Sequence, residues 1–382
     1  MTNRLNPEKP ITVAVIGVRG MGPHQARLLS KLPEYRLVAV CDLDTALAAS
    51  CATDLSVKPY SSMTQLLKEE KPDVVAICTN NTSHAQLTIE AARAGVKAIH
   101  CEKPMATSLG DARAMIAACE DAGVYLVINH QRRIGPDLLE ARRLIERGAI
   151  GTVLECRGYC AGDILSDGTH LVDSLLWLTG DCDAEWVAGH IHRDLSDPIW
   201  QPKDGPPNPR PGFRYGHPVE SGGMGLVRLK SGTRMELYCG DYQSERAYQE
   251  YEIIGTGGRL WRIGDQVRPN LFIQDEKGGD CKMVFDPQRW HHVAVPSGHG
   301  PWRAVPRDEP APGGAICESY RKLARTLRQG EVHPMRAQVA LRGLEIVMAI
   351  YESARLGRRI ELPLEQEHFP LELMLEETFA TA

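Results

Sequence analysis

The feature that most constrains this chain is a glycine-rich turn placed directly after an apolar strand. The run ITVAVIG (11–17) leads into GVRGMGP (17–23), and the next apolar run, RLVAVCD (36–42), ends in Asp42, twenty residues after Gly22. A strand, a glycine turn, a helix start and an acidic residue about 20 positions on form the dinucleotide-binding pattern of a βαβ unit. The spacing therefore predicts a site for a nucleotide pyrophosphate over this turn.

The turn departs from the usual pattern at one position. Arg19 stands where a glycine normally lets the backbone approach the pyrophosphate. Either Gly20 supplies that closeness or the loop is shifted, and Arg19 itself is able to contact phosphate. The predicted cofactor-binding residues of the turn are Gly17, Arg19, Gly20, Met21 and Gly22. Asp42, with Asp44 as a less favoured substitute, is expected to bind the adenosine ribose and to repel a 2′-phosphate, which favours NAD over NADP.

The alternation of apolar runs with amphipathic stretches predicts a doubly wound α/β domain over residues 1–129. Its predicted buried strands are ITVAVIG, RLVAVCD, DVVAICT, KAIHC and VYLVIN. After residue 150 the runs alternate with period two between Gly-rich turns, as in TVLECRGY and TRMELYCG. This pattern predicts a second α/β domain over 130–382 with a large, mainly antiparallel open sheet and C-terminal helices that pack back. The proline-rich run 197–218 predicts an irregular surface loop.

Composition narrows the partners to small molecules. The net charge of −5 comes from 44 basic and 49 acidic residues that are interleaved, so nucleic acid and anionic membranes are not expected partners. No apolar run approaches the ~18 residues of a membrane span, and the N-terminus lacks the basic start of a signal peptide. Eleven cysteines without a C-x-x-C pair indicate thiols in a reducing compartment. We expect a cytoplasmic protein without a metal, since histidines such as His291, His292 and His299 have no cysteine or carboxylate at ligand spacing.

A second motif follows the predicted strand at 97–101. In KAIHCEKP (97–104), Glu102 and Lys103 stand at the C-terminal edge of the sheet, where open α/β sheets bind ligands. With this motif, the run from PDVVAICT to QRRIGP (72–136) resembles the glucose-fructose oxidoreductase, inositol dehydrogenase and MocA family. The similarity covers residues 11–182 and again 314–363.

The resemblance implies a Rossmann domain and a second domain whose open sheet often forms the subunit interface, hence a homodimer or homotetramer. It assigns to Lys103 contact with both the nicotinamide ribose and the reacting hydroxyl. The family's Thr-Pro-Asn-x-x-His turn matches residues 79–84, with Asn80 in place of the proline. The further cofactor-binding residues that it implies are Thr79, Asn81, His84, Glu102 and Lys103. Arg133 matches a substrate-binding arginine of inositol dehydrogenases.

The segment GDILSDGTHLVDSLLWLTG (162–180) matches the family pattern Asp-x-Gly-x-His-x-x-Asp at Gly168, His170 and Asp173, but Ser166 replaces the first aspartate. His170 is expected to be the general base. Asp173, on the same helix face, is the favoured partner that orients His170 or binds a substrate hydroxyl. Asp167 is the alternative: it replaces the missing aspartate, binds substrate or caps the helix. A carboxylate partner would hold the His170 pKa above the ~6.5 of free histidine.

The expected activity is NAD-dependent hydride transfer to or from a secondary hydroxyl or ketone of a sugar, cyclitol or related polyol. Two alternatives stay open. One is a redox-assisted glycosidase of the same family, in which tightly held NAD oxidises a ring carbon transiently. The other is an NAD-binding sensor or scaffold without turnover, which the departures at Arg19 and Ser166 allow.

Overall fold

The computed structural model describes residues 5–6, 8–193, 212–240, 249–264, 270–275, 303–305 and 312–380. Within these ranges, no helix is both long and apolar enough to cross a membrane. The same residues contain no His, Cys, Asp and Glu cluster arranged to hold a metal ion, and ten cysteines are free thiols. His291, His292, His299 and the proline-rich residues 197–211 lie outside the described part of the chain.

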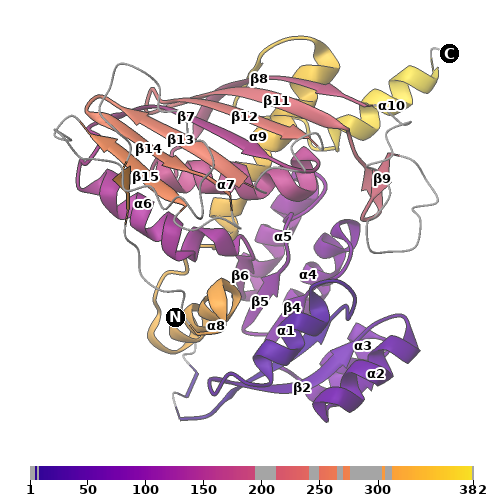
Figure 1. Ribbon diagram of the computed structural model, residues 1–382. Coiled ribbons are helices and arrows are strands. Elements are labelled where there is room, and N and C mark those ends of the chain that lie inside the picture. The colour runs from indigo at the N-terminus through magenta and orange to yellow at the C-terminus, as the bar shows by residue number, and fades with distance from the viewer. Residues whose placement is uncertain are drawn as a thin grey trace, which may run out of the picture.

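The first sheet has six parallel strands in the order β3-β2-β1-β4-β5-β6 (Figure 1). Its strands are β1 (Ile11–Ile16), β2 (Tyr35–Cys41), β3 (Lys58–Tyr60), β4 (Val74–Ile77), β5 (Ala98–Cys101) and β6 (Tyr125–Ile128). The five predicted strands are confirmed, whereas the short edge strand β3 carries no apolar run that could have predicted it. The strand order reverses between β1 and β4, which is where such sheets bind nucleotides.

Helices cover both faces of this sheet because every central strand is buried on both sides. They are α1 (Gly22–Leu29), α2 (Thr45–Leu55), α3 (Met63–Glu70), α4 (His84–Arg93), preceded by the 3₁₀ turn η1 (Asn81–Ser83), and α5 (Leu109–Ala122). The C-terminal helix α8 (Gly314–Gln329) also packs here: the Tyr35 hydroxyl donates to the Tyr320 carbonyl oxygen at 2.7 Å.

The second sheet has nine strands in the order β16-β15-β14-β13-β7-β12-β11-β8-β17. All neighbours pair antiparallel except β7 and β12, so the mainly antiparallel open sheet is confirmed. The strands are β7 (Val153–Cys160), β8 (Ala184–His192), β11 (Gly222–Leu229), β12 (Arg234–Gly240), β13 (Gln249–Gly255), β14 (Gly258–Arg262), β15 (Leu271–Asp275), β16 (Arg303–Ala304) and β17 (Ile360–Glu361).

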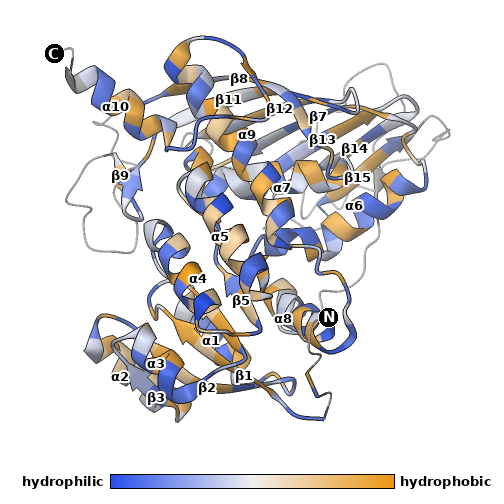
Figure 2. Cartoon of the chain, turned by 180° about the vertical axis from the view of Figure 1, so that it is seen from behind, coloured by the Kyte–Doolittle hydropathy of each residue, from blue (hydrophilic) through white to orange (hydrophobic). Residues whose placement is uncertain are grey.

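Helices lie on one face of this sheet (Figures 1 and 2). Apart from α8, the helices after β6 are α6 (Pro136–Glu146), preceded by the 3₁₀ turn η2 (Gln131–Ile134), α7 (Thr169–Leu178), α9 (Ala337–Leu356) and α10 (Pro370–Ala380). Close packing of α7 and α9 requires glycine on the strands: a Cβ on Gly158 would lie 2.5 Å from Leu171, and one on Gly189 2.7 Å from the Ile350 carbonyl oxygen. No described helix covers the opposite face, where Tyr159, Met224 and Leu226 remain 41–44% exposed.

One hydrophobic core joins the two sheets. It runs from Ile77 and Ile99 of the first sheet through Met115 of α5 to Leu344 of α9 and Leu237 of the second sheet. The layer of helices between the sheets is therefore shared, and the two sheets are held by the same apolar contacts.

A small hairpin interrupts the segment that was expected to be irregular. Strands β9 (Phe213–Arg214) and β10 (His217–Pro218) pair antiparallel. Tyr215 and Gly216 between them have φ of 51° and 90°, as a two-residue type I′ turn requires. The prediction of an irregular loop over 197–218 is thus wrong for its last residues. Proline lacks a backbone N–H, but a two-residue strand pair needs few such donors, so Pro218 is tolerated in it. In both views β9 lies below the large sheet and close to α10 (Figures 1 and 2).

Candidate active site

The glycine turn between β1 and α1 is closed by close backbone approaches. A Cβ on Gly22 would lie 1.9 Å from the Gly17 carbonyl oxygen, and one on Gly17 2.6 Å from the Cys78 carbonyl oxygen. Gly20, by contrast, has a φ of +51° and no atom of the described chain within 4 Å of the place for a Cβ. Gly17 and Gly22 therefore fold the turn, and Gly20 leaves its open side accessible to a phosphate.

Asp42 fastens this turn with both carboxylate oxygens. Its Oδ2 accepts from the Val18 N–H at 2.8 Å and its Oδ1 from the Asp44 N–H at 2.9 Å. Because each carboxylate oxygen can accept a second hydrogen bond, Asp42 retains the capacity to receive two ribose hydroxyls. Arg19 is accommodated because its side chain, 69% exposed, points outward and pairs with Asp44 at 2.8 Å.

The turn after β4 is tied to the segment after β5 by His84. This side chain is fully buried. Its Nδ1 lies 2.8 Å from the Pro104 carbonyl oxygen and its Nε2 3.2 Å from that of Thr79. Burial lowers the pKa of His84. Both ring nitrogens lie against backbone carbonyl oxygens, so His84 links this turn to the residue that follows Lys103.

Glu102 belongs to a buried polar chain behind Lys103. Its Oε1 accepts from the Asn129 amide at 2.8 Å and from the Gln25 amide, and its Oε2 accepts from the Lys103 N–H at 3.3 Å. Gln25 in turn accepts from the Tyr320 hydroxyl. Burial raises the pKa of the Glu102 carboxyl. The chain links α1, the ends of β5 and β6, and α8, so it fixes the backbone from which Lys103 projects.

Lys103 reaches from the first sheet to the motif of the second. Its Nζ donates to the Ser166 carbonyl oxygen at 2.6 Å and lies 3.6 Å from Asp167 Oδ1. The side chain is 20% exposed. Two motifs that are more than sixty residues apart in the sequence therefore meet at one ammonium group.

The segment 162–180, which carries His170, contains one turn of π-helix, η3 (Ile164–Gly168), which leads into α7. Asp163 caps the turn, since its Oδ1 accepts from the Ser166 N–H at 2.6 Å. Such turns are frequent at functional sites. Here the turn directs the Asp167 carboxylate toward Lys103, whereas the Ser166 hydroxyl accepts from the Asn81 amide at 3.4 Å.

His170, at the start of α7, is 4% exposed. Its buried Nδ1 has no hydrogen-bond partner among the described residues, and its ring stands edge-on to His130 with centroids 5.6 Å apart. Burial lowers the pKa of His170 well below its usual value, and the positive charges of Lys103 and Arg132 lower it further. The expectation of a raised pKa is wrong, because within the described ranges no carboxylate forms an ion pair or hydrogen bond with the ring.

Asp173 pairs with Arg133 instead of His170. Its carboxylate accepts from Nε and Nη2 of Arg133, each at 2.9 Å. Nη1 of the same guanidinium pairs with Asp181 at 2.8 Å, and the group lies 5.1 Å from the Trp177 ring centre. Arg133 is 0% exposed. In this structure Arg133 is therefore a buried ion-pair residue, and Asp173 is one of its two counter-ions.

Two residues of the hairpin β9–β10 reach this site although no sequence pattern marked them. Nη1 of Arg214 donates to Asp167 Oδ2 at 2.8 Å, and Nε2 of His217 lies 2.9 Å from the Asn81 amide nitrogen. Both stand in the proline-rich run, outside any motif and beyond the family resemblance. Only the fold could bring them to the site.

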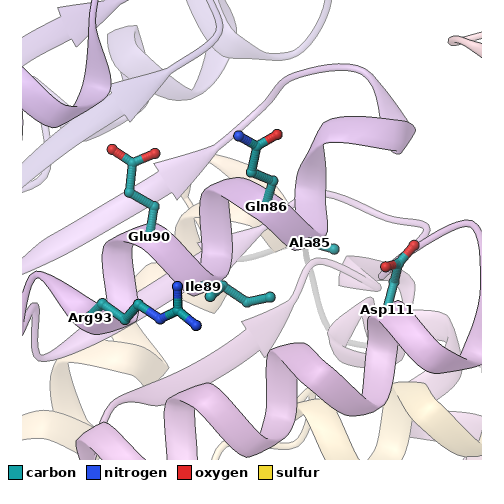
Figure 3. A pocket seen from close by; sticks show the side chains of 6 residues that line it. All are labelled: Ala85, Gln86, Ile89, Glu90, Arg93 and Asp111. Atoms are coloured by element: carbon teal, nitrogen blue, oxygen red, sulfur yellow. The ribbon is translucent and has the colours of Figure 1, made fainter.

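A surface depression on the outer side of α4 and α5 shares no residue with this site (Figure 3). It is lined by Ala85, Gln86, Ile89, Glu90, Arg93 and Asp111. The labelled side chains point in different directions and do not converge on one point (Figure 3).

Comparison with known proteins gives concordant matches. Residues 11–130 match the model of the Gfo/Idh/MocA oxidoreductase family, NAD-binding Rossmann fold. The chain is 36% identical over 351 residues to the D-apiose dehydrogenase of Paraburkholderia graminis, covering 85% of this chain and 83% of that protein. It is 24% identical to the scyllo-inositol 2-dehydrogenase (NAD(+)) of Bacillus subtilis, covering 94% and 99%. The WlbA dehydrogenase of Bordetella pertussis, crystallised with NADH and UDP-GlcNAcA, superposes with a TM-score of 0.71 at 21% identity, covering 94% of this chain and 100% of that one.

The buried ion pairs of Arg133 with Asp173 and Asp181 predict that replacing Arg133 strongly destabilises the fold. Arg133→Leu should lower the free energy of unfolding by about 3–5 kcal/mol, because it leaves Asp173 and Asp181 without their cation in a buried setting. Urea unfolding followed by circular dichroism measures this loss. Arg359→Gln is the matched control: its ion pair with Glu361 is more than half exposed, and its loss should cost under about 1 kcal/mol. An Arg133 variant of normal stability but raised KM would restore the substrate-binding role.

Proposed function

This chain belongs to the Gfo/Idh/MocA family of oxidoreductases, and we propose that it transfers hydride between NAD and a secondary hydroxyl or ketone of a sugar, cyclitol or related polyol. The observation that carries the proposal is the position of the Lys103 ammonium. It lies 2.6 Å from the Ser166 carbonyl oxygen and 3.6 Å from Asp167 Oδ1, in the turn directly before the helix that carries His170. Two similar proteins are named as dehydrogenases of a sugar and of a cyclitol, which supports the substrate class.

NAD is the cofactor, and the described residues fit it. The open side of the turn at Gly20 leaves room for a pyrophosphate, and Asp42 has acceptor capacity left for the ribose. We assign Thr79 and Asn81, on the neighbouring turn, to the nicotinamide half. When bound, NAD supplies the hydride acceptor or donor. His84 and Glu102 act indirectly in this proposal, by fixing the segments that carry Thr79 and Lys103.

In the oxidative direction, His170 accepts the proton of the substrate hydroxyl. Its lowered pKa suits this role, because the ring is then neutral and able to accept at physiological pH. Lys103 donates a hydrogen bond to the same oxygen and stabilises the negative charge that develops as hydride leaves the carbon. The Asp167 carboxylate restrains the ammonium through one oxygen and pairs with Arg214 through the other.

We also propose a division into residues 1–129 and 130–382, with the second domain forming a homodimer or homotetramer through the open face of its sheet. Tyr159, Met224 and Leu226 project from that face and are each 41–44% exposed. Met224 stands opposite Tyr238, which in turn stands opposite Tyr159. A run of aromatic and apolar side chains across neighbouring strands is typical of a subunit interface.

The activity is tested by following NADH absorbance with a panel of sugars, cyclitols and their keto forms. Net NADH equal to product supports a dehydrogenase, product without net NADH a redox-assisted glycosidase, and binding alone a sensor. On a substrate that is turned over, Lys103→Met should lower kcat by about 10² to 10⁴, the effect of losing a positioned charge-stabilising group, with a much smaller change in NAD affinity. Near-normal turnover of this variant would refute the role of Lys103.

Cofactor choice should depend on Asp42. The wild type should bind NAD more tightly than NADP, and Asp42→Ala should reduce that preference, because the repulsion of the 2′-phosphate is lost. Titration of both cofactors by tryptophan fluorescence measures it. Asp44→Ala is the control. The backbone N–H of residue 44 still donates to Asp42 in this variant, so the turn stays fastened and the preference for NAD should be kept. An unchanged preference in Asp42→Ala would show that the ribose is held elsewhere.

The pH profile should reflect a histidine with a lowered pKa. Oxidation needs neutral His170, so kcat/KM should rise with pH and reach its plateau below pH ~6.5, since the pKa lies under that of free histidine. Arg132→Gln should move the midpoint upward because it removes one of the charges that lower this pKa. Exposed Arg147→Gln should leave the midpoint unchanged. A midpoint above 6.5 in the wild type would contradict the assignment.

Assembly should depend on the open face of the sheet. Leu226→Glu should dissociate the oligomer, because a charge buried in an apolar interface is costly. Leu154→Glu is the matched control: Leu154 is 46% exposed, but its side chain lies on the other face, which it shares with buried Cys156. Light scattering after size-exclusion chromatography gives the mass of each variant. Dissociation by both variants, or by neither, would argue against this interface.

A further inference from the structure

The hairpin β9–β10 contacts both halves of the candidate site. Its tip lies against the cofactor turn, since a Cβ on Gly216 would come within 2.7 Å of the Thr82 hydroxyl oxygen. Its base is held by Arg193, whose guanidinium donates to the carbonyl oxygens of Gly212 and Val219, both at 3.0 Å. Between tip and base, Arg214 and His217 stand opposite each other in the strand pairing. The hairpin is therefore anchored independently of the contacts that these two side chains make.

His217 holds the amide of the cofactor turn. The side chain is fully buried, and its Nδ1 lies 2.8 Å from the Pro218 carbonyl oxygen, so this nitrogen carries the proton. Nε2 is then an acceptor, and it receives the Asn81 amide at 2.9 Å. Burial lowers the pKa of His217, which keeps the ring in this neutral form. The orientation of Asn81 is thus set by a residue of the other domain.

Arg214 holds the carboxylate beside Lys103. Its Nη1 lies 2.8 Å from Asp167 Oδ2 and 3.4 Å from Asp163 Oδ2, while the other oxygen of Asp167 lies 3.6 Å from Lys103 Nζ. Burial works against the charge of Arg214, but Asp167 and Asp163 outweigh it and raise its pKa. Asp163 also caps the π-helical turn. Without Arg214, the Asp163 and Asp167 carboxylates on one turn would lose the cation that they share.

The same contacts account for serine at position 166. The Ser166 hydroxyl lies 3.5 Å from His217 Nε2, whose lone pair already accepts the Asn81 amide. An aspartate here would set a carboxylate against that lone pair and close to Asp163, which is unfavourable in a buried setting. In this chain the carboxylate is one residue later, and Arg214 is the cation that restrains it.

We propose that Arg214 and His217 are positioning residues with separate tasks: Arg214 sets the Asp167 carboxylate against Lys103 for the reaction, and His217 sets the Asn81 amide for NAD binding. The inference rests on the proposed function, because Lys103 and Asn81 are taken as its reacting and cofactor residues. It goes beyond that function by making a segment outside the family resemblance necessary for both.

The test measures NAD affinity, kcat at saturating NAD and thermal stability in matched variants. Arg214→Ala should lower kcat by about 10- to 100-fold with NAD affinity within about twofold. His217→Leu should weaken NAD binding by about 5- to 10-fold, the effect of one lost hydrogen bond, with kcat within about threefold. Arg359→Gln, whose ion pair with exposed Glu361 is separate from the site, should change neither quantity.

Rescue distinguishes positioning from support of the fold. Millimolar guanidinium should restore a measurable part of the kcat of Arg214→Ala, whereas neutral urea of the same shape should not. His217→Gln, which again offers an acceptor to Asn81, should recover most of the NAD affinity that His217→Leu loses.

Several outcomes would overturn the proposal. Parallel losses of kcat, affinity and melting temperature in both variants would mean that the hairpin only supports the fold, and unchanged values would mean that it does nothing. If Lys103→Met lowers kcat and Arg214→Ala does not, the inference fails while the proposed function stands. Absence of any wild-type turnover overturns the proposed function together with the Arg214 task, and the His217 task is then decided by NAD affinity alone.

Discussion

The hydrogen bond from the Lys103 ammonium to the Ser166 carbonyl oxygen, 2.6 Å long, is the contact on which the rest of the site depends. An ammonium that is only 20% exposed has lost most of its water and needs partners that stay in place. Both sides of this contact are accordingly fixed from behind. Glu102 and His84 hold the Lys103 segment, and Asp163 caps the turn that presents Ser166. These buried contacts fix the backbone on both sides of the hydrogen bond.

The two carboxylates on either side of His170, Asp167 and Asp173, each form an ion pair with an arginine. Asp173 pairs with Arg133 inside the helix layer, and Asp167 pairs with Arg214. His170 is left among positive charges, which lower its pKa and keep the ring able to accept a proton. In the proposed reaction, burial and the surrounding positive charges would keep His170 neutral without an aspartate beside it.

The local part of this molecule could be predicted from its sequence, and the part that depends on distant contacts could not. The glycine turn, Asp42 at the end of the second strand and the five buried strands are set by spacing within short stretches, which makes them predictable from the sequence. The meeting of Lys103 with the His170 motif followed from the family resemblance. Helical spacing correctly placed Asp173 on one face with His170, but Arg133, forty residues earlier, takes its carboxylate. Arg214 and His217 lie in a proline-rich run without periodicity, and a single π-helical turn leaves no mark in the sequence that would have placed the Asp167 carboxylate beside Lys103.

The continuous core bears on how a substrate enters. Met115 of α5 and Leu344 of α9 belong to one apolar cluster that spans both sheets. A hinge motion that parted the sheets would bring this cluster into water, at about 25 cal/mol for each Å² of apolar surface. Parting the two sheets is therefore unfavourable. In the proposed reaction, a substrate would have to reach His170 through local movement of side chains, with the two sheets kept together by this core.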